Sequence, residues 1–226
     1  DGWNRVADDA FELANFITSQ YRAQTTFLMG HSMGSFLART VMVKHPDFYC
    51  GVIIMGTGCD KGLIGKLGKM IAKREIRKNG SKAGGVLLNK LCFSSYNKAF
   101  EPVATDFDWL SRDVSEVDKY IKDDKCGFLC TNGFFYDLLT GIEYANDRDK
   151  IASLPKDLPL LIISGDMDPV GDMGKGVKKV YDLYTSAGIA DVTLKLIPGA
   201  RHELLNEVDR KSTYDILSDW LDSHLY

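Results

Sequence analysis

The sequence predicts an α/β fold, with a mostly parallel sheet that is covered by helices on both faces. Helical segments alternate with short apolar runs, which is the pattern of parallel-sheet proteins. Residues 158–163 are almost continuously apolar, as expected for a strand buried on both faces. The 226 residues, 45% hydrophobic and 26% charged, have the composition of one globular domain, or of one domain with a large insertion. The net charge of −3 gives no sign of nucleic-acid binding, and no apolar run approaches the ~20 residues that span a bilayer.

The individual elements follow from the spacing of apolar residues and from glycine and proline stops. Helices are predicted at 3–20, 33–44, 175–187 and 213–224. Buried strands are predicted at 25–29, 49–55, 158–163 and 192–197. Between the second and third strands, residues 59–148 are helix-like and contain no convincing strand, and they are far too many for an ordinary connection. We therefore expect a core made of residues 1–58 and 149–226, with residues 59–148 inserted as a helical cap.

The pentapeptide at residues 30–34 fits the pattern G-x-S-x-G, and it lies between a predicted strand and a predicted helix. In that context a sharp turn lifts the serine hydroxyl above the sheet, and small residues at both ends let neighbouring backbone pass closely. Ser32 is therefore the candidate nucleophile. The backbone N–H of Met33, at the start of the helix, is the candidate donor to a developing oxyanion.

A serine hydroxyl needs a general base, and a carboxylate must hold that base in the correct tautomer. Among the four histidines, His202 follows a predicted strand, where such sheets keep their functional sites. The loop after strand 158–163 offers Asp166 and Asp168, and Asp172 is a more distant candidate. The residues alone leave the choice between these carboxylates open.

The stretches 30–35, 164–168 and 198–203 resemble the capped α/β-hydrolases, in particular the monoacylglycerol lipase, lysophospholipase and serine-aminopeptidase-like group. The resemblance covers essentially the whole chain, and the order Ser32, Asp168, His202 is that of α/β-hydrolases. It implies that Asp168, rather than Asp166, is the triad acid. It also implies a small acyl ester as substrate, such as a monoacylglycerol or a lysophospholipid.

The chain departs from this group at its start, because the residues before Ser32 hold only one helix and one strand. Relatives carry several strands there, and one of the loops donates the second oxyanion N–H. We expect this chain to be the C-terminal part of a hydrolase of roughly 300 residues, since four strands with connections occupy roughly 80 residues. The alternative is that another chain supplies the strands. On its own the chain is expected to be weakly active and poorly soluble.

The cap contains a basic amphipathic segment, residues 61–82, with eight Lys and Arg and one Glu. It fits two interpretations: a surface that docks on anionic lipid interfaces, or the solvated outer face of a cap helix weakened by three glycines. The aromatic residues that follow, Trp109 among them, fit an acyl-chain pocket or the packing of the cap onto the core.

Two other functions are weighed against ester hydrolysis. A serine aminopeptidase needs cap carboxylates for a substrate ammonium, and Glu143, Asp147 and Asp149 are available. A non-catalytic binding protein of the same fold would be expected to lose a triad residue, whereas candidates for all three are present. No nucleotide-binding fingerprint and no zinc-ligand spacing occurs in the sequence, so neither a cofactor nor a metal is expected. Cys126 and Cys130 are interpreted as small core residues that could share a helix face. The odd count of five cysteines favours a reducing, cytoplasmic location.

Overall fold

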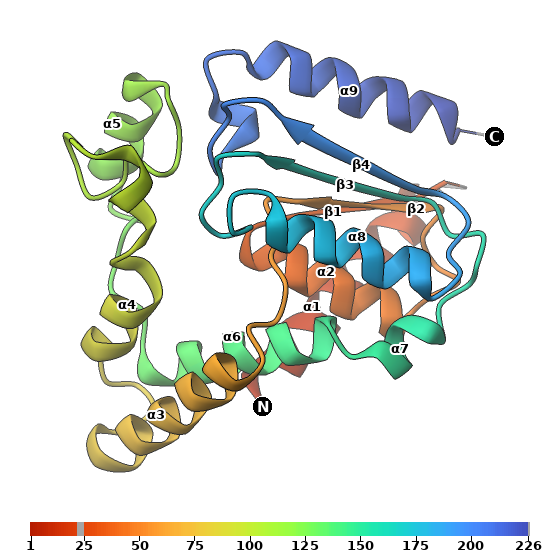
Figure 1. Cartoon of the computed structure of the whole chain (residues 1–226). Helices are drawn as coiled ribbons and strands as arrows, with labels where there is room; N and C mark the ends of the chain where they lie inside the picture. Colours follow the sequence, from red (N-terminus) through yellow and green to blue (C-terminus); the bar gives the residue numbers. More distant parts are fainter. Residues whose placement is uncertain (22–24, 226) are drawn as a thin grey trace.

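The computed structural model describes residues 1–21 and 25–225. Within them, four parallel strands form one sheet in the order β1-β2-β3-β4. The strands are β1 (Phe27–His31), β2 (Gly51–Met55), β3 (Leu160–Gly165) and β4 (Val192–Ile197). Every residue of β2 and β3 is buried, as the apolar runs predict for central strands with both faces covered (Figure 1).

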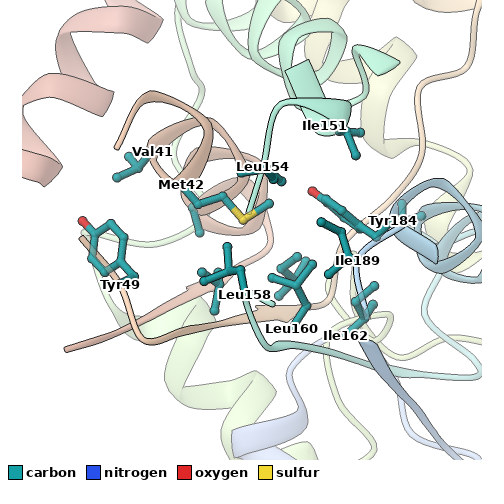
Figure 2. Close-up of a cluster of buried hydrophobic side chains, with 14 of the residues drawn as sticks. Val41, Met42, Tyr49, Ile151, Leu154, Leu158, Leu160, Ile162, Tyr184 and Ile189 are labelled. Atoms are coloured by element: carbon teal, nitrogen blue, oxygen red, sulfur yellow. The ribbon is translucent and has the colours of Figure 1, made fainter. Parts of the chain in front are cut away.

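Alternate side chains of the central strands build two separate cores. On one face, Val52, Ile54, Leu160 and Ile162 pack against α1 (Gly2–Tyr21), α2 (Met33–Lys44) and α8 (Lys175–Ser186). Figure 2 shows part of this core, where Met42 of α2 and Tyr184 of α8 lie among Leu158, Leu160 and Ile162. On the other face, Ile53, Met55, Leu161 and Ile163 pack against Trp220 of α9 (Arg210–Ser223). The period-two alternation thus assigns a helical layer to each face.

A long helical segment joins the adjacent strands β2 and β3; we call residues 56–159 the β2–β3 segment. It extends to one side of the sheet (Figure 1). In the described structure it adds no strand to the sheet and contains only an isolated antiparallel bridge between Gly84 and Thr131. Its elements are α3 (Leu63–Asn79), α4 (Val86–Phe93), η1 (Tyr96–Phe100), α5 (Val114–Lys122), α6 (Asn132–Ala145) and α7 (Arg148–Ala152).

Arg39 of α2 ties the β2–β3 segment to the core at two junctions, one near the start of the segment and one at the end of α6. Its fully buried guanidinium donates to the Gly58 carbonyl (3.1 Å), where the segment leaves β2. It also donates to the Ala145 carbonyl (2.7 Å) and to Asn146 Oδ1 (2.9 Å), where α6 ends. A further bond, from Nε to the Tyr184 hydroxyl (3.0 Å), holds Arg39 against α8. All these acceptors are neutral, so the guanidinium is satisfied by hydrogen bonds without a carboxylate partner.

Two local predictions, on the first strand and on Cys126 and Cys130, were wrong. The first strand was expected to be buried and to end before Gly30, but β1 runs to His31, and Met29 is 41% exposed. Trp220 covers Phe27 on that face of β1, whereas Met29 stays partly exposed within the part of the chain that the structure describes. Gly65 and Gly68 lie inside the 17-residue α3, so the glycines of this segment do not end the helix. Cys126 and Cys130 share no helix face and are only half-buried, because α5 ends at Lys122 and both follow in a loop.

Candidate active site

Ser32 sits at the sharp turn where β1 ends and α2 begins. Its backbone has φ 55° and ψ −121°, a left-handed conformation that a residue with a side chain rarely adopts. The Ser32 N–H donates to the Met55 carbonyl at the end of β2 (3.1 Å), which fixes the turn to the neighbouring strand. Met33 is the first residue of α2, so its N–H has no acceptor within the helix and stays available to an anion.

Only one of the two motif glycines is explained by close backbone approach. A Cβ at Gly30 would lie 2.0 Å from the Gly34 carbonyl oxygen and 2.9 Å from the Ala38 Cβ, so β1 can pass α2 only without a side chain there. A Cβ at Gly34 would meet nothing within 4 Å in the described structure. The expectation that both ends of the motif are sterically restricted is therefore right for Gly30 and wrong for Gly34.

His202 and Asp168 form a buried pair at the carboxyl ends of β4 and β3. His202 Nδ1 lies 2.9 Å from Asp168 Oδ2, and both side chains are almost fully buried. The same carboxylate accepts from the Ser164 hydroxyl (3.2 Å) and from the Val170 N–H (2.9 Å). Because an ionised carboxylate can only accept, the hydrogen of the neutral imidazole is assigned to Nδ1, which leaves Nε2 free to take a proton.

The other candidate carboxylates have different partners. Asp166 Oδ1 accepts from the Gly199 N–H (2.7 Å) and so holds the turn after β4. Asp172 lies in the turn that precedes α8, with φ 53°. Among the carboxylates that follow β3, Asp168 is the one that contacts His202 in the described structure.

The remaining histidines at helix ends also lie elsewhere. His45 stacks on Phe11 at the end of α2, and His224 pairs with Asp191 at the end of α9. Neither approaches the pair of His202 and Asp168.

Two glycines allow the site loops to meet. A Cβ at Gly165, the last residue of β3, would lie 2.0 Å from the Ala200 carbonyl oxygen and 2.3 Å from that of Arg201. A Cβ at Gly56 would lie 3.0 Å from the His31 ring and 3.3 Å from His202 Cε1. These positions place the His202 loop against the ends of β2 and β3. Sequence reasoning missed Gly56, although a glycine directly after a buried strand was the available signal.

His31 links the turn that carries Ser32 to the loop that carries His202. Its Nε2 lies 3.0 Å from the His202 carbonyl oxygen, and the two rings are 4.6 Å apart. A carbonyl only accepts, so Nε2 of His31 carries the hydrogen. Burial and the neighbouring His202 lower the pKa of His31 to about 4, which keeps the ring neutral at pH 7. In the described chain no hydrogen bond joins the Ser32 hydroxyl to His202, a bond that in such sites often tightens only in the substrate complex.

The β2–β3 segment reaches the site through Trp109. The Trp109 ring lies 5.1 Å from the His202 ring, and the Tyr96 ring also packs against Trp109, at 4.9 Å. Burial raises the pKa of Tyr96 far above its usual range, so its hydroxyl stays protonated. The backbone of the His202 loop is joined to the same stretch, because the Glu203 N–H donates to the Leu110 carbonyl (2.7 Å).

A buried carboxylate, Glu207, strengthens this connection. It accepts from Arg112 Nε (2.9 Å) in the β2–β3 segment and from the Arg201 N–H (2.8 Å) beside His202. Glu207 is almost fully buried, so the pair is screened little by solvent. Sequence reasoning missed this residue, since nothing in its local pattern separates it from a solvated glutamate.

Neither a metal nor a membrane-spanning helix can be placed in residues 1–21 and 25–225. There, no three His, Cys, Asp or Glu side chains come together in a way that could hold a metal ion. No helix of this part of the chain has the length and apolar content needed to cross a bilayer.

The family model described as "Serine aminopeptidase, S33" matches residues 1–209. The chain belongs to this family. Monoglyceride lipase of Mus musculus is 29% identical over 202 residues, which cover 88% of this chain and 58% of the mouse protein. Monoglyceride lipase of Homo sapiens is 27% identical over 217 residues, 94% of this chain and 63% of the human protein. The S33 chain thus spans about three fifths of the length of these relatives.

A solved structure establishes the fold of this S33 chain. A thermostable carboxyl esterase from Bacillus coagulans, in complex with glycerol, is 27% identical with a TM-score of 0.86, over 96% of this chain and 69% of that one. The fold is therefore that of an α/β-hydrolase, as the resemblance implied.

Proposed function

We propose that this chain carries the catalytic centre of a serine hydrolase that cleaves carboxylic esters. The observation that carries the proposal is the buried pair of His202 and Asp168, tied through His31 to the strained turn at Ser32. In this mechanism the Ser32 hydroxyl attacks the ester carbonyl while its proton passes to His202 Nε2. Asp168 stays ionised and stabilises the imidazolium, and the Met33 N–H donates to the oxyanion.

The remaining steps return the enzyme to its starting state. The tetrahedral intermediate expels the alcohol, which takes the proton from His202 and leaves an acyl-Ser32 ester. Water then attacks the acyl carbonyl, its proton passes to His202 Nε2, and the acid leaves as the Ser32 hydroxyl is restored.

We assign residues 59–148 the role of a cap over this centre, on a core of residues 1–58 and 149–226. The contact of Trp109 with His202 supports this role, because it places an apolar ring next to the base. Phe93, Tyr96 and Trp109 pack together next to His202, and we assign them to the surface that accommodates an acyl chain. The proposed substrates are acylglycerols or lysophospholipids, in line with the monoglyceride lipases among the relatives.

Peptide hydrolysis is the alternative that the family description suggests. It would need a free cap carboxylate to bind a substrate ammonium. Glu143 already pairs with Lys69, and Asp147 pairs with Lys150 while it accepts from two N–H groups at the start of α7. Asp149 remains exposed at the start of α7. Two of the three candidate carboxylates are thus neutralised by partners, which favours the ester.

The deciding experiment measures fatty-acid release from a chain-length series of monoacylglycerols, with aminoacyl anilides as the peptide-like arm. Ser32→Ala should abolish ester turnover, whereas Ser153→Ala, a matched change at an exposed serine, should leave it unchanged. Anilide turnover above ester turnover would overturn the ester assignment. Ester turnover that survives Ser32→Ala would overturn the proposed nucleophile.

A further inference from the structure

The outer face of α3 carries an apolar stripe that no other part of the described chain covers. Leu63, Ile64, Leu67 and Met70 are 83%, 72%, 56% and 67% exposed. At about 100° per residue, Leu63, Leu67 and Met70 share one side of the helix, and Ala72 points the opposite way. Ala72 is the one fully buried residue of α3.

The inner side of α3 is already engaged. Lys69 pairs with Glu143 of α6, and the ammonium groups of Lys69 and Lys73 lie 5.5 and 5.6 Å from the Tyr136 ring. Figure 1 shows that α3 lies in a part of the β2–β3 segment that is remote from the sheet. The apolar stripe therefore faces outward, away from the side of α3 that packs against the rest of the segment.

Basic side chains surround and continue this stripe. By the same helical spacing, Lys66 and Arg77 lie to one side of it, Lys78 lies to the other, and Arg74 follows it by one turn. Met70, Lys73, Arg74, Arg77 and Lys78 line a surface hollow of about 460 Å³. No acidic residue lines this hollow, and Glu75, the one acid of residues 61–82, is half-buried.

The charge of the whole chain is divided unevenly. Residues 61–82 carry a net charge of +7, and the whole chain carries −3, which leaves −10 on the remaining residues. Such a distribution attracts α3 to an anionic surface and repels the rest of the molecule from it. The uneven charge would therefore orient the protein with α3 towards the anionic surface.

We propose that α3 docks the protein on an anionic phospholipid bilayer. Leu63, Leu67 and Met70 enter the boundary between headgroups and acyl chains, and Arg74, Arg77 and Lys78 contact lipid phosphates. An apolar stripe flanked by Lys and Arg is the pattern of helices that lie in a membrane interface. A nucleic acid would use the basic groups but would leave the apolar stripe exposed to water, so the bilayer fits both features.

The proposal connects to ester hydrolysis without depending on it. The segment that carries α3 also carries Trp109, which lies against His202, so docking would bring a bilayer ester towards the proposed centre. That consequence rests on the proposed function. Docking itself can be measured with hydrolysis switched off, so the two proposals fail separately.

The test is flotation of the Ser32→Ala protein with vesicles of phosphatidylcholine, with and without phosphatidylglycerol, at low and high salt. Each basic residue near an anionic surface strengthens binding about fivefold. The triple change Arg74→Gln, Lys78→Gln and Arg77→Gln should therefore weaken binding to the anionic vesicles about a hundredfold. The matched control removes three exposed lysines from α8 (Lys175→Gln, Lys178→Gln, Lys179→Gln) and should weaken it far less.

A second variant tests the apolar part. Leu63→Ser with Leu67→Ser alters only exposed positions of α3, so the fold should persist by circular dichroism, and binding should fall at both salt concentrations. Equal losses in the α3 and α8 variants would overturn the proposal, and so would equal binding to both kinds of vesicle. Binding to a single-stranded oligonucleotide in place of vesicles, or self-association of the protein through α3, would overturn it as well.

Discussion

Replacing Arg39 should loosen both junctions of the β2–β3 segment at once. Arg39→Met keeps an unbranched side chain in the same space but removes every donor. The Gly58 carbonyl, the Ala145 carbonyl and Asn146 Oδ1 then lose the partner that they share in the folded chain. Arg39 also donates to the Thr57 hydroxyl (3.4 Å). The hydroxyls of Thr57 and Tyr184 can rotate towards other partners, so the other three oxygens carry most of the penalty.

The magnitude follows from these three acceptors. A buried acceptor without a donor costs about 1–3 kcal/mol, which gives an upper range of roughly 3–9 kcal/mol. Removal of a desolvated cation offsets part of this cost, because apolar replacements of buried charges are often tolerated. We expect Arg39→Met to lower the free energy of unfolding by about 3–5 kcal/mol. Arg39→Lys keeps the charge but lacks the forked donors, so it should recover only part of the loss.

The assay combines urea unfolding with hydrogen exchange. Urea midpoints give the change in free energy, and exchange should accelerate most in peptides that cover residues 56–60 and 142–148. A loss below about 1 kcal/mol in Arg39→Met would refute the reasoning, since even one orphaned buried acceptor costs that much. Faster exchange spread evenly over the sheet would refute the assignment of Arg39 to the junctions.

Three further predictions concern the site itself. Asp168→Asn should leave the protein folded but lower kcat about 10⁴-fold, because an amide can favour the wrong tautomer of His202. Steady-state ester kinetics measure the loss in kcat, and circular dichroism checks that the variant is folded. Gly165→Ala should lower the free energy of unfolding by about 2–3 kcal/mol and reduce kcat, because the new methyl group meets two carbonyl oxygens of the His202 loop. An unchanged free energy of unfolding together with an unchanged kcat would contradict this steric argument. The pKa of His31 is about 4 in the folded state, below the value of 6.5 in the unfolded state. Between these pH values the unfolded chain therefore binds more protons than the folded chain. The free energy of unfolding should fall by about 3 kcal/mol as the pH drops from about 6.5 to about 4. His31→Gln should flatten that slope in urea midpoints measured across this range, and an unchanged slope would show that other groups cause it.

The four strands, their parallel class and the candidates for the site could be predicted from the sequence because they depend on local patterns. Apolar runs of the right length marked β2 and β3, and a strand followed by G-x-S-x-G marked the turn at Ser32. The choice between Asp166 and Asp168 needed the family resemblance, since both follow the same strand. In the structure their roles separate by geometry: one holds a turn, and the other meets His202.

What the sequence could not supply is which distant segments touch. The bond from His31 to the His202 carbonyl joins residues 171 positions apart, and the pair of Arg112 and Glu207 joins residues 95 apart. Such contacts arise when parallel strands bring their carboxyl ends to one edge, so they depend on the register of the sheet and not on any local pattern.

The position of His202, the proposed general base, depends on the β2–β3 segment as well as on the sheet. His202 is held from the core by Asp168 and by the His31 side chain, whereas its flanking residues are held from the segment by Leu110 and Arg112. A displacement of the segment would pull directly on the Glu203 N–H and on Glu207, within five residues of His202. The buried guanidinium of Arg39 restrains the same segment near its start and at the end of α6. A substitution at a junction far from Ser32 should therefore lower kcat through the position of His202, even where the substrate-binding surface is unchanged.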